Sequence, residues 1–189
     1  MSSIITKIKV AFFFLGLSSL LWFSYRIIVD RADYIANGYS LAIDLIILFS
    51  VLCFASSMFA FILCGSKNTN NIHVLLGSAS FIFVLNNVNI AIESIVITNN
   101  TGSMLLLISS IIIIAIQLIL GFILLFKKAM MISIISSLFG CMSVVIYGSI
   151  YFVYNLFDGK YIYLIIFGIA CMLVSYLALT FAAKKARDN

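Results

Sequence analysis

The amino-acid sequence predicts an all-α, polytopic membrane protein: a bundle of about six transmembrane helices with the N-terminus and the C-terminus in the cytoplasm. Composition is the first observation that predicts it. Of the 189 residues, 65% are hydrophobic and only 9% are charged, and the mean hydropathy is +1.26, whereas charged residues make up about 25% of an average soluble domain. So few polar side chains leave a soluble globule without a polar coat.

The length of the apolar runs is the second observation. Lipid offers no hydrogen-bond partner to the backbone, so only helices and closed barrels span it. The runs here reach the roughly 20 residues that a spanning helix needs, about twice the length of a barrel strand. The sequence contains no proline, which favours uninterrupted helices.

Six segments are long and apolar enough to cross the hydrocarbon layer. We expect spans at residues 10–29, 41–64, 72–97, 104–126, 130–154 and 161–183. Their connections are short, and no internal repeat or linker is evident. The sequence therefore predicts a single transmembrane domain over residues 1–189.

The first span is interpreted as a signal anchor. Lys7 and Lys9 precede its apolar run, as they do in a secretory signal. However, the run continues to about Val29, and no small-x-small cleavage site precedes Arg26 and Asp30. We expect this span to remain in the membrane.

The third span is the most polar, because Asn86, Asn87, Asn89 and Glu93 interrupt its apolar stretch. A re-entrant segment, and thus five spans, is the alternative. That alternative would place Lys127 and Lys128 outside the cytoplasm, against the tendency of Lys and Arg to stay inside. Six spans are therefore preferred.

The distribution of Lys and Arg is the third observation, and it sets the orientation. Most of the 11 basic residues fall in segments that are cytoplasmic when the N-terminus is inside. These are Lys7, Lys9, Lys67, Lys127, Lys128, Lys184, Lys185 and Arg187. The outer segments hold Arg26, Arg31 and Lys160. The net charge of +5 therefore points to anionic lipid headgroups and gives no support to nucleic-acid binding.

Every tyrosine except Tyr176 lies in an outer half or outer loop, where an interfacial ring is favourable.

Three ionisable residues within the spans share one depth, towards the outer side. Arg26 lies near the end of the first span, Asp44 near the start of the second and Glu93 near the end of the third. Charges in a bilayer normally face the bundle interior or water and find one another. We expect Arg26 to pair with Asp44, Glu93 or both.

A polar stripe extends inward from these charges. Asn86, Asn89 and Glu93 are spaced i, i+3, i+7, which places them on one face of a helix. Together with Arg26 and Asp44 they are the candidate ligand-binding residues, forming an outward-facing pocket for a small polar solute or cation. The alternative is an interhelical clamp, in which the amides and the ion pair only hold helices in register.

Other features indicate packing more than chemistry. Small residues form ridges on the fifth and sixth spans, which predicts close approach to other helices. These residues are Ser133, Ser136, Gly140 and Ser143, then Gly168, Cys171, Ser175, Ala178 and Ala182. We expect a neighbouring helix to satisfy Gln117, and His73 to be interfacial. Cys53, Cys64, Cys141 and Cys171 lack zinc-site spacing, so we expect no metal and no cofactor.

Enzyme activity is not expected. A serine hydrolase is not expected, because the only histidine is at the cytoplasmic end and no GxSxG elbow occurs. The HExxH motif of metallohydrolases and the Walker loop of nucleotide hydrolases are also missing. An aspartyl mechanism needs two carboxylates that share a proton, and a nearby Arg26 would favour keeping both ionised.

Two functional classes therefore remain. The leading one is a solute-binding or transport component. In span number, size and orientation the chain resembles the substrate-binding subunits of energy-coupling-factor vitamin transporters, although the AxxxA pattern of their first span is missing, since Ala11 stands alone. The alternative is an interaction protein: an accessory subunit, an assembly factor or an immunity protein, with other membrane subunits as partners.

The frequent use of Ile and Asn indicates an AT-rich genome and favours a bacterial cytoplasmic membrane as the location.

Overall fold

A computed structural model describes residues 2–27, 35–36, 38, 40–64, 72–96, 101–126, 130–154 and 162–188. Within these ranges the chain forms six long helices and no strand. The helices are α1 (Ser2–Tyr25), α3 (Ser40–Leu63), α4 (Ile72–Val96), α5 (Thr101–Phe126), α6 (Met130–Val153) and α7 (Ile162–Arg187). Each is long and apolar enough to cross a membrane. The protein is therefore an all-α, multi-pass membrane protein.

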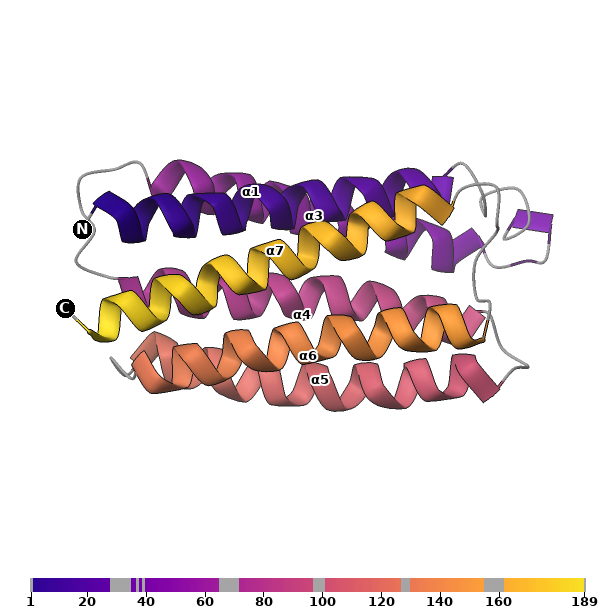
Figure 1. Cartoon of the computed structure of the whole chain (residues 1–189). Coiled ribbons are helices and arrows are strands. Elements are labelled where there is room, and N and C mark those ends of the chain that lie inside the picture. The colour runs from indigo at the N-terminus through magenta and orange to yellow at the C-terminus, as the bar shows by residue number, and fades with distance from the viewer. Residues whose placement is uncertain are drawn as a thin grey trace.

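The helices run up and down, and both termini lie at the same end of the bundle (Figure 1). We call this end, where α1 and α6 begin and α5 and α7 finish, the terminal end. The other end, where α1 and α6 finish and α5 and α7 begin, is the opposite end. By the distribution of Lys and Arg, the terminal end is predicted to face the cytoplasm.

Helix α4 is the centre of the bundle. The chain neighbours pack in the cyclic order α1, α3, α4, α5, α6 and α7, with α7 closing on α1, and α4 also contacts α1, α6 and α7. Of its apolar window, 61% of residues are buried, against 28% for α3 and for α5. α4 is one continuous helix running the length of the bundle (Figure 1), not a re-entrant segment.

The polar residues of α4 explain its central place. Asn86, Asn87, Asn89, Glu93 and Ser94 are all buried. Exposing amides and a carboxylate to hydrocarbon is costly, so the helix that carries them takes the position with the most protein neighbours. The same residues that interrupt the apolar run thus determine which helix is enclosed.

The expected span over residues 10–29 differs most from the structure, because α1 begins eight residues earlier, at Ser2. Lys7 and Lys9 therefore lie within the helix instead of preceding it. Their amines sit 5.4 Å from the Phe181 ring centroid and 5.7 Å from that of Phe61. Long basic side chains at a helix end can cover apolar surface while their charge reaches the interface. The expected ends at residues 28–29, 97 and 161 lie outside the described ranges.

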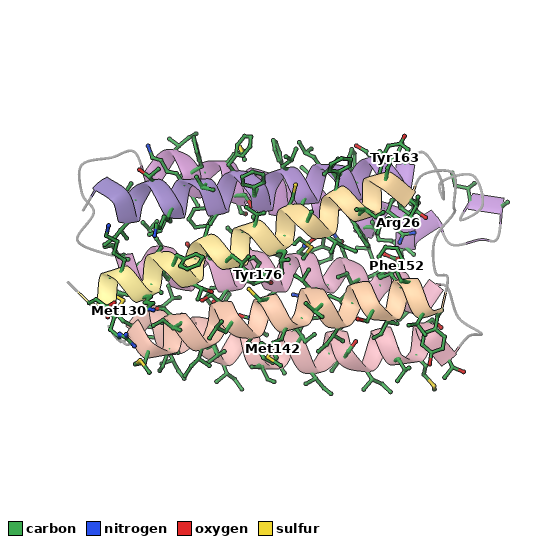
Figure 2. All side chains as sticks on the ribbon, in the orientation of Figure 1. Arg26, Met130, Met142, Phe152, Tyr163 and Tyr176 are labelled. Atoms are coloured by element: carbon green, nitrogen blue, oxygen red, sulfur yellow. The ribbon has the colours of Figure 1, made fainter. Side chains whose placement is uncertain are left out.

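The small-residue ridges of α6 and α7 face other helices. A Cβ on Gly168 would lie 3.7 Å from Trp22, which shows how closely α7 approaches α1. On α6, Gly140 leaves the space that the Tyr176 ring fills, since an added Cβ would overlap that ring. Tyr176 stacks on Phe83 of α4 with ring centroids 3.6 Å apart, about halfway along the bundle (Figure 2).

A hydrogen-bonded cluster ties α4, α5 and α6 together nearer the terminal end. Ser136 Oγ donates to Gln117 Oε1 (3.0 Å), and Gln117 Nε2 donates to the Ser136 carbonyl (3.2 Å). Ser80 Oγ lies 2.9 Å from Ser136 Oγ. A neighbouring helix therefore satisfies Gln117, as its position in the sequence predicts. His73 is half-buried in the first turn of α4.

Candidate functional site

The structure pairs Arg26 with Glu93 near the opposite end of the bundle. Arg26 opens a short π-helical turn that follows α1, and its Nη2 forms an ion pair with Glu93 Oε1 on α4. Both side chains are buried, with 3% and 0% of their residue surface exposed. Figure 2 shows Arg26 close to this end of the bundle. The pair has no net charge, which is how a bundle interior tolerates two ionised groups.

Aromatic side chains surround the pair. The Arg26 guanidinium carbon lies 4.9 Å from the Tyr25 ring centroid and 5.7 Å from that of Trp22, within range for cation–π attraction. Trp22 meets Tyr151 edge to face at 5.5 Å, and the Tyr151 hydroxyl donates a hydrogen bond to Glu93 Oε1. The charges are therefore enclosed by α1, α4 and α6.

Glu93 uses only one of its two oxygens. Both Arg26 and Tyr151 bind Oε1, while Oε2 has no hydrogen-bond partner among the described residues. A buried acceptor of this kind normally has a partner, in protein or in ordered water. Oε2 is thus available to a small donor.

The two stripe amides point to different neighbours. Asn89 Nδ2 donates to Ser50 Oγ on α3 (2.9 Å), and the Ser50 carbonyl accepts from Ser19 Oγ on α1 (2.9 Å). Asn86 Nδ2 lies 3.4 Å from Met172 Sδ on α7. The predicted stripe therefore contributes to two separate interhelical contacts, and Asn86 also borders a cavity.

Asp44 does not join the cluster. It is exposed in the first turns of α3, where the buried face carries Ile43, Ile46 and Ser50. Asp44 follows Ile43 by one residue, about 100° around the helix from that face. Close to the helix end, a carboxylate reaches the headgroups and water, so it does not need a partner in the bundle. Of the two carboxylates expected as partners of Arg26, the structure pairs it with Glu93, and a role for Asp44 in ligand binding stays a prediction.

A small internal cavity adjoins the ion pair. Its volume is about 10 Å³, close to the minimum that can hold one water molecule. Its walls come from α1, α4, α6 and α7 and consist of Ser18, Trp22, Asn86, Ile90, Val144, Tyr147, Tyr151, Ile169 and Met172. The pocket expected from the sequence is therefore closed and narrow here.

Polar groups in the cavity wall have unused hydrogen-bonding capacity. Trp22 is 6% exposed, and its Nε1–H has no partner among the described residues. The buried Tyr147 hydroxyl also lacks a partner in bonding geometry, although Ser110 is near it. With Asn86 and the Tyr151 oxygen, the wall can hold a compact, uncharged molecule that donates and accepts hydrogen bonds.

The site does not resemble a metal centre. No group of three or more His, Cys, Asp or Glu side chains is placed to hold a metal ion in the described part of the chain. Arg26 also opposes the binding of a cation at Glu93. All four cysteines are free thiols.

Sequence reasoning missed the aromatic half of the site. Tyr25, Tyr147 and Tyr151 were expected at the membrane interface, but they are buried with 2%, 4% and 0% of their surface exposed. The available signal was their register. Tyr147 and Tyr151 continue the ridge of Gly140 and Ser143 at helical spacing, so the face that packs against other helices carries them inward.

Comparison with known proteins adds no assignment. No protein-family model matches the chain, and no curated protein and no solved structure matches it either. A function must therefore be argued from the geometry alone.

Proposed function

We propose that this chain is a non-enzymatic, solute-binding component of a membrane transport system. Its site is the cavity beside the Arg26–Glu93 pair, and its ligand is a compact polar solute. The observation that carries the proposal is the Trp22 Nε1–H, which is buried in the cavity wall without a partner among the described residues. A donor left without a partner would cost about 1–3 kcal/mol, so this N–H supports the binding of a polar molecule in the cavity.

The electrostatics favour an uncharged solute. Arg26 and Glu93 neutralise each other, and most of the remaining wall is apolar. A cation would meet the guanidinium, and an anion would meet the carboxylate. A neutral molecule can bind Trp22 and Asn86 without disturbing the pair.

Access to the site fits uptake from outside the cell. By its lining residues, the cavity lies in the half of the bundle away from the termini, the half that the basic residues are predicted to place towards the outer face. Its present volume suits about one water molecule, so a larger solute requires α1 or α6 to move away from α4. The structure then corresponds to a closed state.

The test uses two neighbouring asparagines as a matched pair. Asn86 borders the cavity, whereas Asn87 donates to the Phe83 carbonyl of its own helix (2.6 Å). The protein is extracted gently from its own membrane, and co-purifying small molecules are identified by native mass spectrometry. We expect one retained solute per chain in the unmodified protein and in Asn87→Ala, and its loss in Asn86→Ala.

Two controls keep the test decisive. Thermal unfolding shows whether each variant is folded. If Asn86→Ala unfolds, it is replaced by Trp22→Phe, which removes the indole N–H and leaves a smaller aromatic ring. Retention of the same solute by all variants would refute this site.

The second candidate function is a non-transporting interaction protein, whose ion pair acts as a clamp. The enclosure of Arg26 and Glu93 favours it. Purification with a stoichiometric protein partner and no small molecule would support it over transport.

A further inference from the structure

A second hollow is much larger than the polar cavity and separate from it. It is an open groove of about 670 Å³ between α3, α4 and α5. Its lining is almost entirely apolar: Ser56, Phe59, Ala60, Leu63, Val74, Leu75, Ser78, Phe81, Ile82, Val84, Leu85, Leu118 and Leu125. We call it the α3–α5 groove.

The groove exists because α3 and α5 pack against different partners towards the terminal end. There α3 lies against α1, where a Cβ on Gly16 would meet Met58 and Ser57. α5 lies against α4 and α6 through Gly121 and Gln117. The face of α4 between them stays open.

The groove is about one leaflet deep. Along α4 it extends from Val74 to Leu85, about 16 Å at 1.5 Å per residue, or half of a hydrocarbon core about 30 Å thick. Near the inner end of the groove, α3 closes onto α4 through the Cys53 thiol, 3.7 Å from the Ile82 carbonyl. Beyond that end, Asn89 and Ser50 join the two helices. A spanning helix of a partner would need the full depth, whereas an acyl chain needs only this half.

Basic residues follow the helices that form the groove. In the sequence, Lys127 and Lys128 come directly after the last residue of α5, and Lys67 comes four residues after Leu63 of α3. Lysines that flank the cytoplasmic ends of membrane spans attract anionic headgroups, and each one changes the affinity for an anionic lipid about five-fold. Charge and depth therefore point to the same occupant.

We propose that the α3–α5 groove binds one acyl chain of an anionic phospholipid from the leaflet at the terminal end, with its headgroup at the end of the groove where α5 finishes. This proposal is independent of the solute site.

The test fills the groove with one side chain and compares it with a matched position. Ser78 lines the groove and donates to the carbonyl three residues before it, Leu75 (2.8 Å). Ser109 on α5 is also half-buried and donates to Leu106 in the same way (2.9 Å), but it does not line the groove. The variants are Ser78→Phe and Ser109→Phe.

The full-length protein is reconstituted in equimolar phosphatidylglycerol and phosphatidylcholine, and the retained lipids are counted by native mass spectrometry. We expect one phosphatidylglycerol per chain in the unmodified protein and in Ser109→Phe, and its loss in Ser78→Phe. In the Lys127→Gln/Lys128→Gln variant a lipid is still retained, but the preference for phosphatidylglycerol falls at least five-fold.

Three results would overturn the proposal. They are equal lipid retention by Ser78→Phe and Ser109→Phe, equal retention of the two lipids by the unmodified protein, and a dimer or partner complex that Ser78→Phe disrupts. If Ser78→Phe fails to fold, Ser56→Phe fills the groove from α3 and is read in the same way.

Discussion

Arg26 and Glu93 stabilise the bundle only as a pair. Each is buried where its charge has little solvent, and each supplies the other's counter-charge. Removing one member of such a pair leaves the other uncompensated, which in soluble proteins costs about 3–5 kcal/mol, whereas removing both is often nearly neutral.

Glu93→Gln is therefore expected to lower the free energy of unfolding in detergent by about 3–5 kcal/mol. The double variant Arg26→Met/Glu93→Gln should recover most of this loss. Exposed Asp44 provides the control, since Asp44→Asn should change stability by less than about 0.5 kcal/mol. Equal effects of Glu93→Gln and Asp44→Asn would show that the pair contributes nothing.

Among the described glycines, Gly140 is the one at which an added Cβ comes closest to a neighbouring side chain, so substitution there should cost the most stability. An added Cβ would overlap the Tyr176 ring, itself held against Phe83. We expect Gly140→Ala to destabilise the protein by about 1–3 kcal/mol, as overpacking does. On the same helix, a Cβ on Gly148 would lie 3.8 Å from Ile169, an ordinary contact.

Gly148→Ala is thus the matched control, and both variants are compared by thermal unfolding in detergent. A similar melting temperature for the two would mean that Tyr176 adopts another position at little cost.

At the scale of elements, polar contacts between helices set the position of α4. Asn89 connects it to α3, Glu93 connects it to α1 and α6, and Ser80 connects it to α6. Interhelical hydrogen bonds in membranes average about 0.6 kcal/mol and reach about 1.7 kcal/mol. Several together give the apolar bundle a defined register.

Adjacent serines on α6 test this contribution. Ser136 bonds to α5, whereas Ser137 bonds to the Ser133 carbonyl of its own helix (2.9 Å), and each is 4% exposed. Ser136→Ala should lower the free energy of unfolding by about 0.6–1.7 kcal/mol more than Ser137→Ala. Titration of the purified protein with a denaturing detergent measures the difference, and equal losses would argue against the network.

At the scale of the whole molecule, the placement of both termini at one end requires an even number of crossings. The distribution of basic residues then predicts that this end is cytoplasmic. Lys160→Cys should react with a membrane-impermeant maleimide added to intact cells, and Lys67→Cys should react only after the cells are opened. Serine at the four native cysteines removes the background, and the reverse labelling pattern would invert the topology.

The predictable part of the site was its ionic part. Arg26 and Glu93 share a depth, and the cost of burying charge is large enough to pair them without a structure. The rotation of each helix about its own axis was less accessible. This rotation turns Asp44 away from the Arg26–Glu93 pair and turns Tyr25, Tyr147 and Tyr151 inward. The sequence does not specify it, because it depends on which neighbours each helix packs against.

The sequence by itself determined that the chain is a helical membrane protein with six spans, that its third span carries the polar stripe, and that Arg26 has a carboxylate partner at its own depth. These properties follow from composition, run length and helical periodicity, which are local. Only the tertiary structure decided that α4 is central, that the cavity beside Trp22 and Tyr151 is small and partly aromatic, and that α3 and α5 separate to leave a groove one leaflet deep. The physical reason is that apolar helix faces are chemically alike in lipid, so the fit of small residues against large ones selects which faces meet.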